Sequence, residues 1–174
     1  MLMKNHFQSV PIETQRLILR PLKNIDFKDL CLLDMDPVVR SFFPEGPLDI
    51  EQVHDELERH IAEWQRLGFG IFAAILKYNN KFIGRCGFAK LDSGEVEMGY
   101  LFLKEYWSQG YATETAIALL QWAEKNVSAK RIIGFAPISH SASIKVLEKS
   151  GMEFFKTDFY HDIQCNYYQK LLQK

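Results

Sequence analysis

One glycine stands where an extended, aromatic stretch gives way to a helix. The segment EYWSQGYATETAIALLQWA runs from Glu105 to Ala123, with Gly110 at its hinge. The first turn of a helix presents unpaired N–H groups and the positive end of the helix dipole, and together these bind phosphate groups. A glycine here would let the backbone approach such an anion, but it could equally serve only to turn the chain. The choice depends on what the neighbouring elements place beside it.

The cysteines and histidines predict neither a disulfide nor a metal site. Cys31, Cys86 and Cys165 are odd in number, far apart in the chain, and form no C-x-x-C pair. We interpret Cys86, in FIGRCGF, as a buried small hydrophobic residue and not as a nucleophile. His54 and His60 lie six positions apart on a predicted helix, so they do not share a helical face as metal ligands would.

Length and charge restrict the class of protein. The chain has 174 residues, which fits a single domain spanning 1–174 with a sizeable core. Its formal net charge is −1, so no overall positive field favours nucleic acid or an anionic membrane, and an anionic ligand would have to be bound locally. The N-terminus carries no leader pattern, and no apolar run approaches the ~18 residues of a membrane span. We therefore expect a cytoplasmic protein.

Hydrophobic periodicity predicts seven strands. Alternating or apolar runs place them at 13–22, 69–78, 81–90, 95–103, 131–137 and in a closing hairpin at 152–161 and 164–172. The turns NN (79–80) and DSG (92–94) predict that the second, third and fourth strands run antiparallel.

Four helices separate these strands. Asp26 is predicted to cap the first, and Asp49 with Gln52 forms a capping box for the second, which ends at Gly68. The third follows Gly110, and the fourth spans 141–151 with Gly151 as its C-terminal cap. The strand ending near 103 and the strand starting at 131 should then be parallel neighbours joined by the third helix. Ligands bind at the carboxyl ends of strands where the sheet topology switches, which favours the phosphate interpretation of the glycine hinge.

These segments resemble the GNAT superfamily of N-acetyltransferases. The superfamily signature is Arg/Gln-x-x-Gly-x-Gly/Ala at the start of the central helix, and the branch that acetylates ribosomal-protein N-termini usually shows W-G-x-G-Y-A-T-E; this chain has WSQGYATE at 107–114. Four further stretches match in the same order: ETQRLILRPL, GFGIFAAILK with FIGRCGF, EVEMGYLFL, and SIKVLEKSGM. Two positions depart from the pattern, because Ser108 replaces a glycine and His140 replaces an asparagine that typically helps to hold coenzyme A.

The resemblance implies a mixed α+β fold. Its central sheet would be mostly antiparallel, with about six to seven strands, flanking helices and one parallel β-α-β pair that splays to bind acetyl-coenzyme A. It implies transfer of an acetyl group to a primary amine, directly within a ternary complex, with acetyl-coenzyme A as co-substrate and no metal. We expect a monomer or a homodimer with no direct binding to nucleic acid or membrane.

The resemblance also assigns the residues that bind the cofactor. Backbone amides from the hinge would bind the pyrophosphate without a basic side chain: Ser108, Gln109, Gly110, Tyr111, Ala112 and Thr113. Backbone groups of Leu101, Phe102 and Leu103 would pair with the pantetheine arm, and one of their N–H groups would stabilise the oxyanion. His140 and Ser143 would contact the cofactor, while Lys145 and Lys149 are either partners of the 3′-phosphate or solvated residues.

Two residues are assigned to proton transfer. Glu97 aligns with the general base of some family members, although Glu95 lies on the same face of the strand. Ser143 aligns with the proposed proton donor to the leaving thiolate, and its alternatives on the closing hairpin, Tyr160, Tyr167 and Tyr168, are more typical of aromatic packing.

The acceptor is left open between a peptide N-terminus, a lysine side chain and a small-molecule amine. Its walls are predicted to be the FFPEGP loop (42–47), the helix end at Trp64, the GFG segment at 68–70 and the closing hairpin. A non-catalytic acyl-coenzyme A-binding module on the same fold is the alternative function. An unrelated nucleotide-binding protein is disfavoured, since the chain has neither G-x-G-x-x-G nor a Walker lysine.

Overall fold

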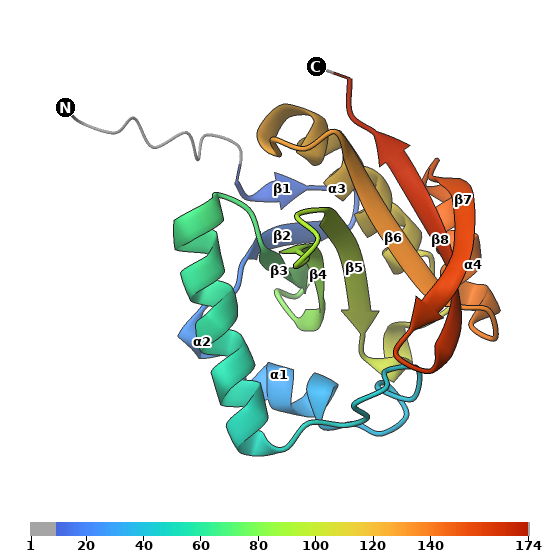
Figure 1. Ribbon diagram of the computed structural model, residues 1–174. Helices are drawn as coiled ribbons and strands as arrows, with labels where there is room; N and C mark the ends of the chain where they lie inside the picture. Colours follow the sequence, from blue (N-terminus) through green and yellow to red (C-terminus); the bar gives the residue numbers. More distant parts are fainter. Residues whose placement is uncertain (1–9, 174) are drawn as a thin grey trace.

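The three-strand meander expected from the hairpin turns forms the middle of one eight-stranded sheet in the computed structural model, which describes residues 10–173 (Figure 1). The sheet order is β1-β2-β3-β4-β5-β6-β8-β7, and only β5 and β6 are parallel neighbours. The strands are β1 (Ile12–Glu13), β2 (Leu17–Pro21), β3 (Ile71–Leu76), β4 (Phe82–Lys90), β5 (Val96–Phe102), β6 (Arg131–Pro137), β7 (Glu153–Tyr160) and β8 (Ile163–Leu171). The predicted mixed fold is confirmed.

The eighth strand arises because the predicted strand 13–22 is interrupted by a turn. The Thr14 amide donates to the Leu17 carbonyl, and the Leu17 amide donates to the Thr14 hydroxyl, both at 2.9 Å. This turn folds β1 back onto β2, so that Ile12 pairs with Leu19. The ten-residue run 13–22, whose apolar and polar residues alternate as in one strand, therefore belongs to two short strands, β1 and β2.

Four α-helices lie in the described part of the chain: α1 (Phe27–Asp34), α2 (Ile50–Leu67), α3 (Tyr111–Asn126) and α4 (Ser141–Lys149). The capping box of α2 is confirmed, since Asp49 and Gln52 exchange two hydrogen bonds of 2.8 Å. Its C-terminal cap, Gly68, has the left-handed conformation, with φ 76°. Gly151 follows α4 with φ 85°, and its amide donates to the Glu148 carbonyl as a helix-ending glycine should.

The prediction for Asp26 is wrong in its detail. Asp26 precedes α1, but its side chain makes no capping hydrogen bond to that helix. Its carboxylate accepts from the Lys23 amide at 2.8 Å and from both terminal nitrogens of Arg20, at 2.8 and 2.7 Å. The ion pair with Arg20 on β2 therefore uses the oxygens that a cap would need.

Two hydrophobic cores cover the two faces of the sheet. One packs α1 and α2 against β3 and β4 through residues such as Leu33, Leu57 and Phe82. The other packs α3 and α4 against the opposite face, through Leu119, Leu147 and Ile132 among others. Figure 1 shows α2 to the left of the sheet and α3 partly behind β6. Among residues 10–173, no helix is both long and apolar enough to cross a membrane.

Candidate functional site

The parallel strands β5 and β6 separate soon after they begin. They pair only at Val96–Ile132 and Glu97–Ile133, whereas β4 pairs with β5 as far as Phe102 and β6 pairs with β8 as far as Pro137. The side of β5 that faces β6 is therefore free of sheet partners beyond its first residues. This gap lies at the topological switch of the sheet, where ligands bind in open α/β sheets.

Alternation along β5 decides which backbone groups face the gap. The Leu103 amide donates to the Ile83 carbonyl at 2.9 Å, so Leu103 and Leu101 direct their backbone groups toward β4. The amides of Tyr100 and Phe102 then point the other way, toward β6. The Phe102 carbonyl already accepts a hydrogen bond of 2.8 Å from the Trp107 indole nitrogen. Of the three predicted pantetheine partners, Phe102 is the one whose amide faces the gap.

The hinge before α3 places its amides in the open. Ser108 and Gly110 both have left-handed backbones, with φ 59° and 82°, and residues 108–110 are exposed. The first hydrogen bond of the helix runs from the Glu114 amide to the Gly110 carbonyl, at 3.0 Å. The amides of Tyr111, Ala112 and Thr113 precede that bond and have no partner in the helix. Turns of this kind, with successive N–H groups on one side, form anion-binding concavities.

The left-handed backbone at Ser108 explains the glycine that the family usually has there. A residue with a side chain pays a penalty in this region that glycine does not, so serine is tolerated at a cost of about 1–2 kcal/mol. Neighbouring side chains hold the turn: the Gln109 side chain donates to the Glu105 carbonyl at 2.7 Å, and Trp107 fastens it to the end of β5.

The structure separates the two candidate carboxylates on β5. Glu95 accepts hydrogen bonds from Arg131 Nε and Nη2 at 2.8 and 2.5 Å, so its charge is paired. Within the described residues the Glu97 carboxylate has no hydrogen bond or ion pair, and burial raises its pKa to about 7. Its neighbours are phenols: the charge of Glu97 contributes to the raised pKa values of Tyr160 and Tyr167, for which burial is the main cause.

Ser143 lies in the first turn of α4 and meets a residue that the sequence analysis did not single out. The Tyr100 hydroxyl lies 3.0 Å from the Ser143 hydroxyl and donates to the Ser143 carbonyl at 3.1 Å. Burial, opposed by the hydrogen bond to Ser143, raises the pKa of Tyr100 to about 12, so the phenol keeps its proton. Side chains alternate between the two faces of a strand, so Tyr100 points to the same face of β5 as Val96 and Met98, which lie in the core covered by α3 and α4. This alternation could have indicated from the sequence that Tyr100 faces α4.

His140, which departs from the family pattern, stacks on the loop between α1 and α2. Its ring lies parallel to that of Phe42, with centroids 3.7 Å apart, and burial lowers the pKa of His140. His140 precedes α4 without capping it through its side chain. The FFPEGP loop also reaches the closing hairpin, because the Glu45 carboxylate lies 3.6 Å from His161 Nε2. Both contacts attach the loop to the half of the split sheet that contains β6, β8 and β7.

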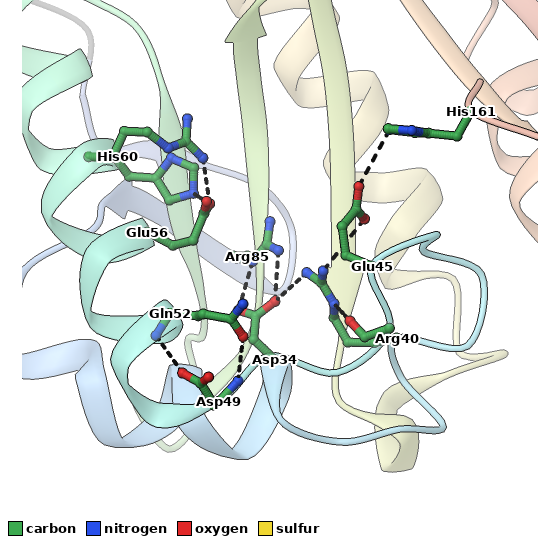
Figure 2. Close-up of polar contacts among 11 residues, drawn as sticks. Asp34, Arg40, Glu45, Asp49, Gln52, Glu56, His60, Arg85 and His161 are labelled. Atoms are coloured by element: carbon green, nitrogen blue, oxygen red, sulfur yellow. Dashed lines mark hydrogen bonds and ion pairs between the residues drawn. The ribbon is translucent and has the colours of Figure 1, made fainter.

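A buried ion cluster fixes this loop from below. Figure 2 shows the Asp34 carboxylate between the guanidinium groups of Arg40 and Arg85. The distances are 2.7 and 3.0 Å to Arg85 and 3.2 Å to Arg40, whose Nε donates to the Gly46 carbonyl at 2.8 Å. Burial alone would raise the pKa of Asp34, but the two guanidinium groups lower it. His60 adds no charge here, since burial first and then the Arg85 charge lower its pKa to about 3.

The predicted wall at Trp64 is wrong. Trp64 lies near the C-terminal end of α2, whereas the FFPEGP loop joins the N-terminal end of that helix. Its indole nitrogen donates to the Ile71 carbonyl at 2.8 Å, and its ring packs on Phe72 and Trp122 in the core. The GFG segment (68–70) packs in the same core, since Gly70 lies against the Trp64 ring.

The remaining candidate site residues are either packed against other side chains or exposed at the surface. Tyr167 stacks on Phe135 with centroids 4.7 Å apart, Tyr160 tilts against Phe135 at 4.9 Å, and Tyr168 donates to Glu148 on the opposite face. Lys145 and Lys149 are exposed on α4. Cys86 is 1% exposed and burial raises its pKa, so its thiolate is disfavoured. Within the described residues, no group of three or more possible ligands could hold a metal ion.

The chain is similar to acetyltransferases along most of its length. The sequence profile described as "Acetyltransferase (GNAT) domain" matches residues 16–153. The Bacillus subtilis protein YkkB, described as uncharacterized, is 30% identical over 148 residues, which are 83% of this chain and 86% of YkkB. The uncharacterized N-acetyltransferase p20 of Bacillus licheniformis is 28% identical over 87% of this chain and 85% of its own.

Solved structures share the fold. A GNAT-family acetyltransferase from Bacillus anthracis superposes with a TM-score of 0.80 at 26% identity, covering 94% of this chain and 99% of the other. Two more distant structures contain coenzyme A. They are RimL, a ribosomal L7/L12 α-N-protein acetyltransferase (TM-score 0.76, 15% identity, 94% and 97% covered), and a Vibrio cholerae spermidine N-acetyltransferase with spermine (TM-score 0.76, 14% identity, 90% and 95% covered).

Proposed function

Because the chain belongs to the GNAT family of acetyltransferases, which use acetyl-coenzyme A, we propose that it acetylates a primary amine by direct transfer within a ternary complex. The observation that carries the proposal is the gap between β5 and β6, which opens next to unpaired amides at the start of α3. A chain of net charge −1 can bind a polyanion there through backbone groups alone.

The residues present fit the cofactor. Acetyl-coenzyme A supplies an acetyl thioester, an amide-rich pantetheine arm and a pyrophosphate. We assign the pyrophosphate to the amides of residues 108–113 and the pantetheine amides to the gap-facing groups of β5, with the Phe102 amide as one donor. His140 stays neutral near pH 7 because its pKa is lowered. One of its ring nitrogens can then donate a hydrogen bond to the pantetheine arm, and the other can accept one from it.

Glu97 is proposed as the general base. The attacking amine is mostly protonated at neutral pH and must lose a proton. A carboxyl group with a pKa of about 7 is matched to that task, because it is substantially ionised at neutral pH and is still a useful base. Its lack of a charged partner leaves its oxygens available to the amine or to an intervening water. Glu95, paired with Arg131, is not available in the same way.

Ser143 is proposed to return a proton to the leaving thiolate. Its hydroxyl lies at the start of α4, beside the gap, and the Tyr100 phenol holds it from the β5 side at 3.0 Å. Tyr100 thus acts as a positioning residue for Ser143. A thiolate is a good leaving group, since the pKa of an unperturbed thiol is only ~8.5, so this step adds less to the rate than the base does.

The environment of Cys86 supports the proposal of direct transfer. A covalent acetyl-enzyme would need an accessible thiolate, but Cys86 is buried with a raised pKa. The near-neutral pKa of Glu97 favours catalysis over a module that only binds acyl-coenzyme A. The acceptor is proposed to enter beside the FFPEGP loop and the turn of the closing hairpin, and the acceptors named for the neighbours, a ribosomal protein and spermidine, define the two classes to compare.

The test is turnover of acetyl-coenzyme A against a panel of amines: peptides with free N-termini, lysine peptides, and small amines including polyamines. We expect one class to be acetylated, coenzyme A to raise the melting temperature by mass action, and the intact mass of the enzyme to stay unchanged without acceptor. A melting shift with NAD or ATP but none with coenzyme A would overturn the cofactor. One acetyl group accumulating on Cys86 during turnover would overturn direct transfer.

A further inference from the structure

Arg16 reaches across the molecule to the hinge before α3. It lies in the turn between β1 and β2, 98 positions before Glu114 in the sequence. Its backbone amide and its Nε donate to the two carboxylate oxygens of Glu114 at 2.8 and 2.7 Å, and its Nη1 donates to the Gln109 carbonyl at 2.9 Å. The guanidinium carbon also lies 4.1 Å from the centre of the Tyr111 ring. One side chain therefore holds three positions around the hinge.

The turn that presents Arg16 is attached to the same carboxylate. The Thr14 hydroxyl donates to Glu114 Oε1 at 2.5 Å, and it accepts the Leu17 amide. These are the bonds that interrupt the predicted first strand and separate β1 from β2. The interruption therefore fixes Arg16 against α3.

The negative charge of Glu114 would repel a bound pyrophosphate, and Arg16 neutralises that charge. Although burial would raise the pKa of Glu114, hydrogen bonds from Thr14 and Arg16 lower it, so the carboxylate is ionised. A carboxylate in the first turn suits the helix dipole, but it lies in the same turn that is proposed to receive a pyrophosphate. The Arg16 guanidinium neutralises it at 2.7 Å.

The Nη2 nitrogen of Arg16 lies near the hinge glycine, Gly110. Within the described residues, Arg16 Nη2 donates no hydrogen bond, and a Cβ placed on Gly110 would lie 3.4 Å from it. The nitrogen therefore lies beside the backbone position that the pyrophosphate must approach. Glycine at this position keeps that approach open.

We propose that Arg16 is a positioning residue for the cofactor, which aligns the hinge amides through Gln109 and Tyr111 and cancels the charge of Glu114 where the pyrophosphate binds. This inference rests on the proposed use of acetyl-coenzyme A. It separates the phosphate-bearing part of the cofactor, which needs Arg16, from the thioester end, which does not.

The test compares donors with and without the phosphates. For Arg16→Ala we expect the affinity for coenzyme A, measured by calorimetry, to fall about 10–100-fold, the range of charge-assisted hydrogen bonds. The value of kcat/KM with S-acetyl-pantetheine, which has no phosphate, should stay within about 2-fold of the wild type. Arg16→Lys keeps the charge but cannot bond Glu114 and Gln109 together, so we expect an intermediate loss, again only for the phosphate-bearing donor.

Two further variants complete the design. Arg16→Ala with Glu114→Gln should bind coenzyme A more tightly than Arg16→Ala alone, because the uncompensated carboxylate is gone. Arg20→Ala removes another arginine ion pair from β2, with Asp26, and should lower stability without changing the ratio between the two donors. Equal losses for both donors, or no loss for either, in Arg16→Ala and Arg16→Lys would overturn the proposal. A wild-type chain that binds no coenzyme A would instead refute the proposed function.

Discussion

The backbone amides of the cofactor side come from one continuous segment, to which Arg16, His140 and Ser143 add side chains, whereas the acceptor side is assembled entirely from distant segments. Residues 96–114 supply the gap-facing edge of β5, the hinge and the first turn of α3. The FFPEGP loop, by contrast, is held by Asp34 and Arg85 from below and meets His140 and His161. The first side offers backbone amides to its ligand, and the second is held together by ion pairs and ring contacts between side chains.

The difference teaches why the cofactor is easier to infer than the acceptor. Backbone amides at a hinge depend on local conformation, so a short motif is enough to encode them. A surface made from a loop, a hairpin turn and a buried ion cluster depends on residues far apart in the sequence, such as Glu45 and His161, which are more than a hundred positions apart. Changes to the two sides should therefore have separable effects on cofactor affinity and on acceptor KM.

The largest effect is expected at the base between the two sides. Glu97→Gln should lower kcat/KM by about 10²–10⁴-fold at neutral pH, and the loss should shrink at high pH, where the amine is already neutral. The wild-type rate should rise with pH through about 7 as Glu97 ionises. Glu95→Gln is the matched control and should cost only a few-fold, because Glu95 is paired with Arg131. A Glu97→Gln enzyme with the wild-type pH profile would remove Glu97 from the mechanism.

The same residue links activity to stability. The folded pKa of Glu97 is raised, so the fold favours the protonated carboxyl group, and stability contributed by this group is lost as the pH rises through about 7. Glu97→Gln should therefore stabilise the protein more at pH 8 than at pH 5, as measured by urea unfolding. Equal stability changes at both pH values would contradict the raised pKa.

The next largest effect should fall on the acceptor side alone. Asp34→Asn leaves the buried guanidinium group of Arg40 and the largely buried one of Arg85 without their shared carboxylate, and we expect a loss of about 3–5 kcal/mol in the free energy of unfolding at pH 7. Because the pKa of Asp34 is lowered, its contribution is present above the unfolded pKa and is lost as the pH falls through the folded value. Asp92→Asn, in an exposed hairpin turn, is the control.

The cofactor side should be unaffected by that change. The folded fraction of Asp34→Asn should bind coenzyme A with wild-type affinity, while the acceptor KM rises as the FFPEGP loop loosens. A matching loss of coenzyme A affinity would show that the two sides are one structural unit and would break the comparison.

A pair of glycines isolates the hinge. Gly110 and Gly94 have nearly the same left-handed φ, 82° and 85°, but only Gly110 lies before α3. Valine at either position should lower stability by a similar amount, about 1–2 kcal/mol or more. Only Gly110→Val should also weaken coenzyme A binding, by about tenfold or more, since its side chain blocks the approach to the amides. Equal coenzyme A affinities in the two folded variants would make Gly110 a hinge and nothing else.

Helices, strands and helix caps were predicted from the sequence better than the turn that interrupts the first predicted strand. Caps such as Asp49 and Gly151 are local, so they were predicted correctly, and the parallel pairing of β5 with β6 followed from the order of strands. The turn at Thr14 was missed because its hydroxyl binds both a neighbour, Leu17, and a residue 100 positions away, Glu114. Alternation continues through such a turn and cannot reveal it.

The candidate site shows the same division. Gly110 and its neighbours could be assigned from the hinge and the family resemblance, and Glu97 could be named but not distinguished from Glu95. The distinction needed Arg131 on β6, which pairs with Glu95. Trp64 was misplaced because the sequence marks where a helix ends but not which face of the sheet that end reaches.

A smaller effect is expected where the two sides meet. Phe42→Ala removes the ring stacked on His140 and should raise the acceptor KM several-fold, because the loop loses its contact with the start of α4. Coenzyme A affinity should change less. Phe159→Ala, at an exposed site on β7, is the control for losing an aromatic ring. A larger effect on coenzyme A than on the acceptor would assign Phe42 to the cofactor side.

The smallest effect sharpens the view that backbone, not side chains, forms the cofactor side. Ser108→Gly relieves the left-handed strain at the hinge, and the gain is partly offset by the flexibility of glycine in the unfolded chain, so we expect about 0–1 kcal/mol of added stability. Asn80→Gly, at a left-handed position in the turn between β3 and β4, should gain less, because asparagine tolerates this region, and serves as the control. Since glycine presents the same amide, coenzyme A affinity should stay within about 2-fold of the wild type. A tenfold loss of that affinity in Ser108→Gly alone would mean that the serine hydroxyl itself binds the phosphates, and that the hinge of this chain has added a side-chain contact to its backbone ones.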